Sequence, residues 1–496
     1  MEGALAETTL LDRAFTRAAG APLVHGNSVR LLKDSSENYP AWLAAIHGAQ
    51  HRILFENYFI CDDEVGAEFA DALAARARDG VIVRLIHDWL GSLNRSSSSF
   101  WRALRASGVE VRSFNPLRLT RPLDVLHRDH RKLLAVDGRV AFVTGLCVGR
   151  EWVGDAARGI APWRDTGIEV RGPALCDIER AFAQVWATIG PAIPDEDLTA
   201  RESVAPTGDV ALRIVANAPG MSSIFRLDQL IAASARRTLW LTDAYFAGVS
   251  PYVQALRAAA RDGVDVRLLV PGSSDIPFLR PLSQGGYRPL LETGVRVFEW
   301  KGTMMHAKTA VADGRWARVG SSNLNLASWI SNYELDAVVE DERFANEMEA
   351  MHQADLENAT EIVLRSRRRG VLHRFREGEE RRAQNPVLRG SPGSGSASRA
   401  AAGALRLGRT VSAALTEQRV IEPTDARLVG IVGALLLTLA IVAVIWPVVL
   451  ALPLILICAW MGIALLARAR TLRRMRRSRG LPVTRVTRVD RDSAPP

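Results

Sequence analysis

His306-Ala307-Lys308 is followed after four residues by Asp313, and then by Gly320-Ser321-Ser322-Asn323. The same spacing, His-x-Lys-(four residues)-Asp, occurs earlier at His130-Arg131-Lys132 with Asp137. The intervening residues are apolar or Thr (LLAV and TAVA), and each run ends in Asp-Gly, which predicts a buried strand entering a turn. Residues two apart on a strand share a face, so each histidine lies beside its lysine. A base or nucleophile next to a cation is what attack on a phosphate requires.

Lysine is rare in this sequence. The chain has 496 residues and 63 Lys and Arg together, yet Lys occurs only at positions 33, 132, 301 and 308. Two of these positions belong to the two motifs. A chain that uses Arg for nearly every other cation therefore has Lys where a compact ammonium group suits a phosphate oxygen.

The composition indicates folded protein together with a membrane part. Hydrophobic residues make up 48% and charged residues 24%, which excludes a disordered chain. The net charge of +9 favours an anionic partner, such as a membrane surface, a phospholipid headgroup or nucleic acid. The 4 cysteines show no metal-type spacing, so we expect reduced or buried thiols and no metal site. Residues 1–24 lack a continuous apolar core, so no signal peptide is predicted.

Strand-like and helix-like stretches alternate from about residue 41 onward, and the order repeats in a second half. In the first half we expect strands at 52–59, 81–86 and 109–114, and helices at 64–78 and 100–107. In the second half we expect strands at 237–246, 264–270 and 295–300, and a helix at 251–261. This alternation predicts an α/β architecture with a mainly parallel sheet.

The two halves also match letter by letter. Residues 78–85 (RDGVIVRL) parallel 261–268 (RDGVDVRL), Tyr58-Phe59 parallels Tyr245-Phe246, and Gly108-Val109 parallels Gly294-Val295. The matches come in the same order and each series ends at a His-x-Lys motif, which predicts an internal duplication. We expect two homologous halves, 1–200 and 205–362, related by a pseudo-twofold axis that brings both motifs to one cleft.

The C-terminal part differs in character. Residues 363–427 are predicted to be a basic, Gly/Ser-rich linker. Residues 428–467 contain no charged residue and are long enough for two membrane passes, so a C-terminal transmembrane helical hairpin is expected. A shallow re-entrant hairpin stays open, because Pro453 interrupts the second pass. Arginines on both sides, including the tail 468–496, predict that both flanks are cytoplasmic.

The two motifs in a duplicated α/β chain resemble the phospholipase D superfamily, and residues from about 40 to 360 look like a bacterial cardiolipin synthase of that superfamily. The closer resemblance rests on further strings: Glu56-Asn57-Tyr58-Phe59-Ile60, Asp62-Asp63-Glu64-Val65-Gly66, His127-Arg128-Asp129-His130-Arg131-Lys132, Trp163-Arg164-Asp165-Thr166, Val270-Pro271-Gly272-Ser273-Ser274-Asp275 and Gly320-Ser321-Ser322-Asn323-Leu324. It implies two phospholipase D-like halves and a place at the bacterial cytoplasmic membrane. The arginines that flank 428–467 predict that the catalytic halves face the cytoplasm. The C-terminal hairpin departs from family members that are anchored by N-terminal helices.

The resemblance implies a two-step phosphatidyl transfer that uses neither metal nor cofactor. One of His130 and His306 attacks the phosphodiester and forms a phosphohistidine, while the other protonates the leaving alcohol and later deprotonates the incoming one. The remaining expected site residues either bind phosphate oxygens (Lys132, Lys308, Ser321, Asn323), orient their own half-site (Asp137, Asp313), or hydrogen-bond the histidine of the opposite half (Asp165, Glu334).

One departure from the family pattern concerns the first half-site. Family members usually follow the first motif with Gly-Gly-x-Asn, and we align Gly145-Leu146-Cys147-Val148 with that string. Val148 cannot donate a hydrogen bond to phosphate, so this half-site is expected to lack one ligand unless Arg150 or Arg164 replaces it. His306 would then lie in the better-equipped half-site.

The favoured function is a transferase that joins two phosphatidylglycerols into cardiolipin and releases glycerol. A phospholipase D that hydrolyses phospholipid to phosphatidic acid uses the same groups with water as acceptor. A nuclease of the same superfamily is disfavoured, and no nucleic-acid partner is expected, because a membrane hairpin is needless for such a substrate. The reading of Val148 also leaves open a catalytically weak lipid-binding membrane protein. The oligomeric state is not determined by the sequence.

Overall fold

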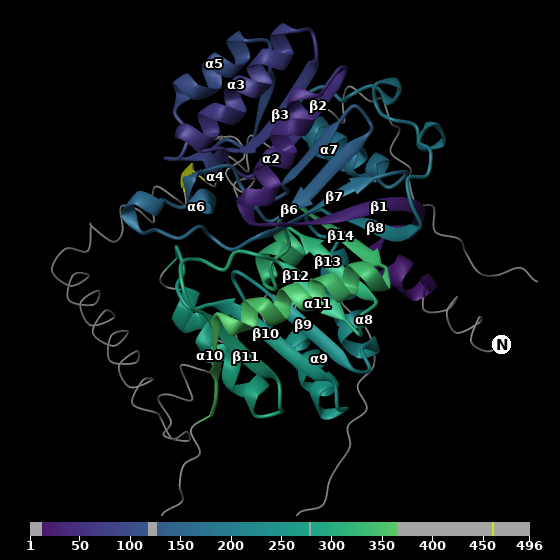
Figure 1. The fold of residues 1–496 in the computed structure, drawn as a ribbon, viewed down its shortest axis with the longest axis vertical. Helices are drawn as coiled ribbons and strands as arrows, with labels where there is room; N and C mark the ends of the chain where they lie inside the picture. The colour runs from purple at the N-terminus through teal and green to yellow at the C-terminus, as the bar shows by residue number, and fades with distance from the viewer. Residues whose placement is uncertain (1–11, 118–125, 277–278, 365–458, 461–496) are drawn as a thin grey trace, which may run out of the picture. The chain divides into compact units, whose positions relative to one another are not determined.

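The computed structural model describes residues 12–117, 126–276, 279–364 and 459–460 (Figure 1). The chain divides into two units, Met1–Ser366 and Arg367–Pro496. Apart from residues 363–364 and 459–460, the expected linker (363–427), membrane hairpin (428–467) and basic tail (468–496) lie outside the described residues. Within the described ranges, no helix combines the length and the apolar character that a membrane crossing needs.

A 15-stranded sheet runs through the first unit, and both halves contribute to it. The first half supplies β1 (Val24–Lys33), β2 (Arg52–Asn57), β3 (Ile82–Asp88), β4 (Glu110–Phe114), β5 (Leu133–Val136), β6 (Val140–Thr144) and β7 (Thr166–Arg171). The second half supplies β8 (Val210–Asn217), β9 (Thr238–Thr242), β10 (Asp265–Pro271), β11 (Arg296–Trp300), β12 (Thr309–Ala312), β13 (Trp316–Gly320), β14 (Glu334–Glu340) and the edge strand β15 (Ala359–Ile362).

The strand order demonstrates the duplication. Outward from the centre, the first half reads β1-β7-β6-β5-β2-β3-β4 and the second reads β8-β14-β13-β12-β9-β10-β11. These orders are equivalent strand by strand, and β1 pairs antiparallel with β8 where the halves meet (Figure 1). The expected pseudo-twofold arrangement of two α/β halves is therefore confirmed.

The expectation of a mainly parallel sheet was wrong. Among the named strands of the described residues, parallel pairing is confined to β2-β3-β4 and β9-β10-β11. Both motif strands turn back at once through Asp-Gly, so β5-β6 and β12-β13 are antiparallel hairpins, and the sheet is mixed. A tight turn can join only antiparallel neighbours.

Helices cover the sheet in equivalent places in the two halves. They are α2 (Asp34–His47), α3 (Glu64–Arg78), α5 (Ser98–Ala106) and α7 (Leu175–Thr188) in the first half, and α8 (Ser223–Ser234), α9 (Ser250–Arg261), α10 (Leu279–Leu291) and α11 (Glu342–Glu357) in the second. The repeated Arg-Asp-Gly string ends α3 and α9. Gly80 and Gly263 lie there at φ 88° and 91°, a left-handed conformation that glycine adopts without strain before the next strand.

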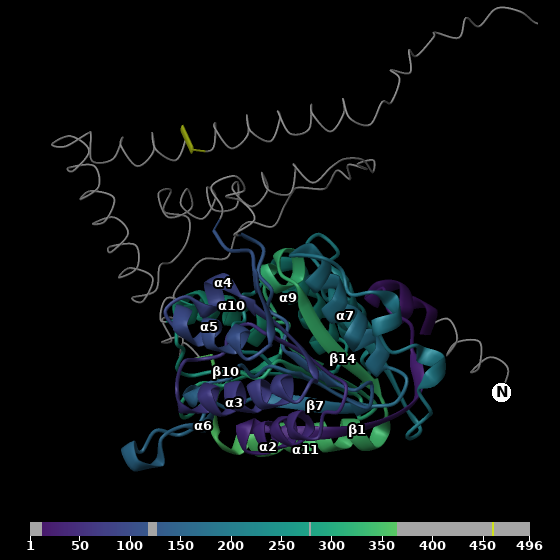
Figure 2. The ribbon, with the colours of Figure 1, turned by 90° about the horizontal axis from the view of Figure 1, so that it is seen from above.

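The core is shared between the halves. One cluster of buried side chains joins Leu54 and Ala135 of the first half to Val311 and Val319 of the second. Helix α11 of the second half also packs on β1 of the first, and α2 contacts the same strand (Figure 2). Because removing apolar surface from water is the main favourable term in folding, this shared cluster holds the two halves together.

Strand β1 is an element that the sequence pattern did not reveal. It precedes residue 41, where we expected the alternation of strands and helices to begin, yet it pairs with β7 on one side and β8 on the other. Its buried Asn27 donates to the carbonyls of Val24 and Val210 and accepts from the amide of Ala174. Its central place thus comes from partners distant in sequence.

Candidate active site

Each motif histidine lies on a segment that is hydrogen-bonded to the opposite half. The backbone amide of His130 donates to the carbonyl of Tyr333 (2.9 Å), and the amide of Tyr333 donates to the backbone carbonyl of Arg128. In the same way, the amide of His306 donates to the backbone carbonyl of Arg164 (2.7 Å), and the amide of Arg164 donates to the carbonyl of Met304. These reciprocal bridges bring the two motifs together at the pseudo-twofold axis.

The bridges place one carboxylate behind each imidazole. His130 Nδ1 lies 3.0 Å from Glu334 Oε2, and His306 Nδ1 lies 2.7 Å from Asp165 Oδ2. These are the cross-half hydrogen bonds that the sequence led us to expect. An ionised carboxylate can only accept, so each Nδ1 carries the proton and each neutral imidazole keeps its lone pair on Nε2. This tautomer leaves Nε2 ready to attack phosphorus or take a proton.

Both motif lysines are buried next to their histidines. Lys132 Nζ donates to the carbonyl of His130, and Lys308 Nζ donates to the carbonyl of His306. Lys308 Nζ also lies 2.9 Å from His306 Nδ1. Because that nitrogen gives its proton to Asp165, the ammonium acts on the ring through its charge and not as a donor.

A tyrosine completes each half-site. Tyr58 lies edge-on to His130 at 5.1 Å and beneath Lys132 at 5.2 Å, measured to the centre of its ring. Tyr245 contacts His306 and Lys308 in the same way, at 5.8 Å in each case. We had not predicted these tyrosines as site residues, although the repeated Tyr-Phe string was the signal that could have identified them.

Burial keeps both imidazoles neutral. Desolvation, together with the nearby Lys308 charge, lowers the pKa of His306 to about 4, although Asp165 acts in the opposite direction. Desolvation also lowers the pKa of His130 against the opposing effect of Glu334. Burial lowers the pKa of Lys308 to about 8. At neutral pH the site therefore combines two neutral imidazoles with a lysine that is close to losing its proton.

Ser321 has a different place from the one we expected. Its hydroxyl donates to Glu334 Oε2 (2.5 Å) and accepts from the amide of Leu335 (3.0 Å). Both contacts fix Glu334, the carboxylate that binds His130. We had expected Ser321 to bind substrate, whereas in the structure its hydroxyl positions Glu334. The equivalent position of the first half is Gly145, where an added Cβ would lie 2.2 Å from Asp165 Oδ1.

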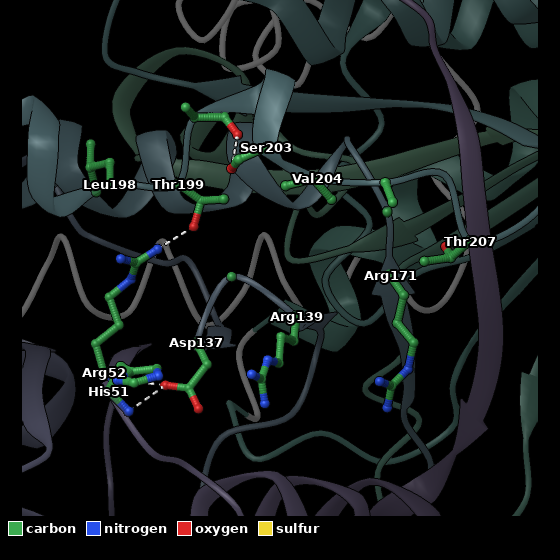
Figure 3. A pocket seen from close by; sticks show the side chains of 14 residues that line it. His51, Arg52, Asp137, Arg139, Arg171, Leu198, Thr199, Ser203, Val204 and Thr207 are labelled. Carbon is green, nitrogen blue, oxygen red and sulfur yellow. Dashed lines mark hydrogen bonds between the residues drawn. The ribbon is translucent and has the colours of Figure 1, made fainter.

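The side chains of the motif aspartates bind backbone amides of the neighbouring strand, which differs from the expectation that they orient their own half-sites. A four-residue strand separates each from its lysine, which corresponds to about 16 Å along the chain. Asp137 accepts hydrogen bonds from three successive amides, those of Gln50, His51 and Arg52 (2.7–2.8 Å), and Figure 3 shows Asp137 beside the last two. Asp313 accepts from the amides of Arg236, Arg237 and Thr238 (2.7–2.9 Å). Each aspartate therefore fixes the start of the neighbouring strand, β2 or β9.

A hollow of about 760 Å³ opens beside the Asp137 turn, and neither His130 nor His306 lines it (Figure 3). Three arginines line it, Arg52, Arg139 and Arg171. Arg52 is paired with Glu179 and Arg171 with Glu169, so both charges are neutralised within the fold. We assign this hollow no part in the chemistry at the histidines.

The strand register corrects our alignment of the first half-site. Leu133 pairs with Val143 in β5-β6, and Thr309 pairs with Val319 in β12-β13. Val143 and Val319 are thus equivalent, and counting four residues on from each makes Cys147 the counterpart of Asn323. Val148 is one residue too far along the chain. The conclusion that this position lacks an amide still holds, because Cys147 is only a weak donor.

Neither arginine that we considered replaces the missing amide. Arg150 is exposed and paired with Glu64. Arg164 is buried, but its guanidinium is bound by Asp355 and Asp34 and by the carbonyl of Asp165. In the second half-site, by contrast, Asn323 Oδ1 is buried and has no hydrogen-bond partner among the described residues.

Comparisons with known proteins agree with this geometry. The family model described as "Cardiolipin synthase, PLD-like domain" matches residues 42–150 and 228–356, one segment in each half. The crystal structure of phosphatidylserine synthase from Haemophilus influenzae is similar with a TM-score of 0.56 over 71% of this chain and 92% of that chain. At 15% identity that likeness concerns the fold alone. Fold and paired motifs together define a phospholipase D-superfamily protein.

Curated relatives narrow the family further. Cardiolipin synthase 1 of Bacillus cereus is 30% identical over 378 residues, 74% of each chain. Cardiolipin synthase A of Pseudomonas aeruginosa is 33% identical over 358 residues, 72% of each chain. The chain belongs to the cardiolipin synthase family of the phospholipase D superfamily and is a phosphatidyltransferase of the cardiolipin synthase type.

Proposed function

We propose that this enzyme joins two phosphatidylglycerols into cardiolipin and releases glycerol, through a phosphatidyl-histidine intermediate. The observation that carries the proposal is the pair of neutral imidazoles, each fixed at Nδ1 by a carboxylate of the opposite half. Two such groups at one axis supply the nucleophile and the acid-base that a double displacement needs.

In the first step, we assign the attack to His306 Nε2. A bond forms between Nε2 and phosphorus, the bond from phosphorus to the headgroup glycerol breaks, and protonated His130 gives its proton to the departing oxygen. Asp165 offsets the positive charge that develops on the His306 ring. His130 gains its proton more readily once substrate is bound, because the phosphate charge adds to that of Glu334.

In the second step, a hydroxyl of another phosphatidylglycerol attacks phosphorus. His130 takes the proton of that hydroxyl, the bond from phosphorus to His306 breaks, and cardiolipin leaves with both histidines restored. Lys132, Lys308 and Asn323 bind the non-bridging oxygens in both steps, where negative charge increases. Asp165, Glu334 and Ser321 position the imidazoles in this scheme and do not touch substrate.

We also propose that residues 428–467 anchor the protein as a helical hairpin in the bacterial cytoplasmic membrane, with the catalytic halves (1–200 and 205–362) on the cytoplasmic side. Support comes from the absence of charge in this stretch and from the arginines at 427 and 468–479. The use of a membrane lipid as both donor and acceptor in the proposed reaction is consistent with that placement.

The test follows headgroup-labelled and acyl-labelled phosphatidylglycerol by mass spectrometry in membranes that contain the protein. Wild type is expected to produce labelled cardiolipin and free glycerol, with and without a chelator, whereas His306→Ala produces neither. Phosphatidic acid as the main product identifies a hydrolase, and absence of any product rejects the enzymatic proposal. In a parallel arm, deletion of 428–467 is expected to move the protein from the membrane pellet to the supernatant.

A further inference from the structure

Asn57, at the end of β2, has a buried side-chain amide without a hydrogen-bond partner in the described part of the chain. The residue is 1% exposed, and neither its Nδ2 nor its Oδ1 has a hydrogen-bond partner among the described residues. Leaving a buried amide unpaired costs free energy, so such a group is retained where it has a partner in the working protein. The question is what partner reaches it.

The strand register places Asn57 in the first half-site. Antiparallel pairing of β2 with β5 runs from Ile53–Val136 to Glu56–Leu133. One step further, Asn57 stands opposite Lys132. Directly paired residues of an antiparallel ladder project from the same face, so the amide and the ammonium share one side of the sheet.

The second half supports this placement. Pairing of β9 with β12 ends at Thr242–Thr309, and one step further Asp243 stands opposite Lys308. The charge of Asp243 is among those that raise the pKa of Lys308, as expected for neighbours. Asp243, however, is used within the fold, because it accepts from the amides of Leu324 and Tyr245. Asn57, its counterpart, makes no such bond.

The two half-sites therefore differ in where an unsatisfied side-chain atom is found among the described residues. In the second half-site it is the acceptor Oδ1 of Asn323, after β13, and the equivalent residue after β6 is Cys147. In the first half-site both the donor Nδ2 and the acceptor Oδ1 of Asn57, at the end of β2, lack a partner. Cys147 itself is buried near Lys132, whose charge opposes the effect of burial on the thiol pKa. The charge of Lys308 acts on the same thiol, so Cys147 lies within electrostatic range of both motif lysines.

We propose that Asn57 is a phosphate-binding residue, whose amide donates to a non-bridging oxygen of the phosphodiester and takes over in the first half-site the task that Asn323 performs in the second. This inference rests on the proposed transfer reaction and names a ligand for it. It also explains how the first half-site keeps an amide donor for phosphate although it has Cys147 at the position equivalent to Asn323.

The experiment measures cardiolipin formation by wild type, Asn57→Leu, Cys147→Asn and the double variant Asn57→Leu/Cys147→Asn. Loss of one donor at a developing oxyanion lowers kcat by about 10²-fold or more, so Asn57→Leu is expected to fall by that factor. Restoring an amide at position 147 is expected to recover activity in the double variant. Cys147→Asn alone is expected to remain close to wild type.

Thermal unfolding separates this role from a structural one. Because the Asn57 amide has no partner within the described ranges, Asn57→Leu is expected to leave the unfolding midpoint unchanged or to raise it. The matched control is Asn27→Leu, which removes a buried amide with three hydrogen bonds in β1; it should lower the midpoint without a specific loss of kcat.

Wild-type turnover by Asn57→Leu overturns the proposal, as does a loss of turnover that follows the loss of folded protein. A loss without any recovery in the double variant overturns the claim that the two positions serve one oxygen. Absence of cardiolipin from wild type would instead reject the proposed function, so the two failures are distinguishable.

Discussion

Burial decides the protonation states on which the chemistry depends. His306 lies between Asp165, which favours the charged imidazole, and a desolvated environment with Lys308, which disfavours it; the second influence prevails, and the pKa falls to about 4. The same burial brings the pKa of Lys308 down to about 8. A nucleophile that must be neutral and a cation that must be charged therefore coexist only in the interval between these two values.

The pH dependence of kcat/KM should show both limits. Activity is expected to fall below about pH 4, where His306 becomes protonated and loses its lone pair. As the pH rises it should decline because protonated His130, the acid of the first step, becomes rarer, and it should fall further above about pH 8, where Lys308 loses the charge that stabilises the phosphate. The measurement is kcat/KM for phosphatidylglycerol in detergent micelles across this range. In Lys308→Arg, whose cation does not titrate here, the alkaline fall should move upward. An unchanged alkaline limit in that variant would remove Lys308 as its origin.

At the scale of elements, each motif is a strand with the reactive His and Lys at one end and a structural Asp-Gly turn at the other. The His-x-Lys end of β5 or β12 faces the axis between the halves. The Asp-Gly end turns with Asp137 or Asp313 at φ 54° and fixes the start of the adjacent strand. Both copies therefore contain the whole His-x-Lys-(four residues)-Asp string for two separate reasons: His and Lys serve the chemistry, and Asp stabilises the fold.

Asp137→Ala and Asp313→Ala should separate these requirements. Each substitution leaves three backbone amides without their acceptor, and we expect the free energy of unfolding to fall by about 2 kcal/mol, the value of hydrogen bonds to a charged group. Urea denaturation provides the measurement. Protein that remains folded should keep its kcat; a large drop in kcat at unchanged stability would instead restore a catalytic role to these aspartates.

On the scale of the whole molecule, the duplication matters because each half supplies the carboxylate that binds the histidine of the other half. The carboxylate that orients His130 belongs to β14, and the one that orients His306 comes just before β7. The order of strands around the β1-β8 junction brings each carboxylate segment beside the opposite histidine. Neither half contains a complete site.

This arrangement predicts that a substitution in one half changes the pKa of the histidine in the other half. Glu334→Gln, in the second half, should lower the pKa of His130 in the first half, because the carboxylate charge that favours its protonated form is gone. The pKa of His306 should stay in place in this variant and fall in Asp165→Asn. NMR titration of ¹⁵N-labelled histidines checks both. A shift confined to His306 in Glu334→Gln would contradict the crossed arrangement.

Local patterns were sufficient for much of this protein. The apolar runs between Lys and Asp predicted β5 and β12, the helical spacing predicted α3 with its observed limits, and the repeated strings predicted the duplication. The spacing of His and Lys identified the reactive groups, and the resemblance supplied their carboxylate partners. These features depend on residues close together in the chain or on comparison of one half with the other, which a sequence contains in full.

Tertiary structure decided the rest. The central place of β1 depends on pairing with β7 and β8, and the antiparallel motif hairpins made the sheet mixed. Strand register, which spacing alone does not fix, moved the missing amide from Val148 to Cys147 and brought Asn57 to Lys132. The motif aspartates have the residue type of a catalytic orienter, but at the far end of a strand their side chains bind backbone amides of the neighbouring strand. Chemistry can be read from residue type, whereas its partners depend on which distant segments the fold brings within hydrogen-bonding distance.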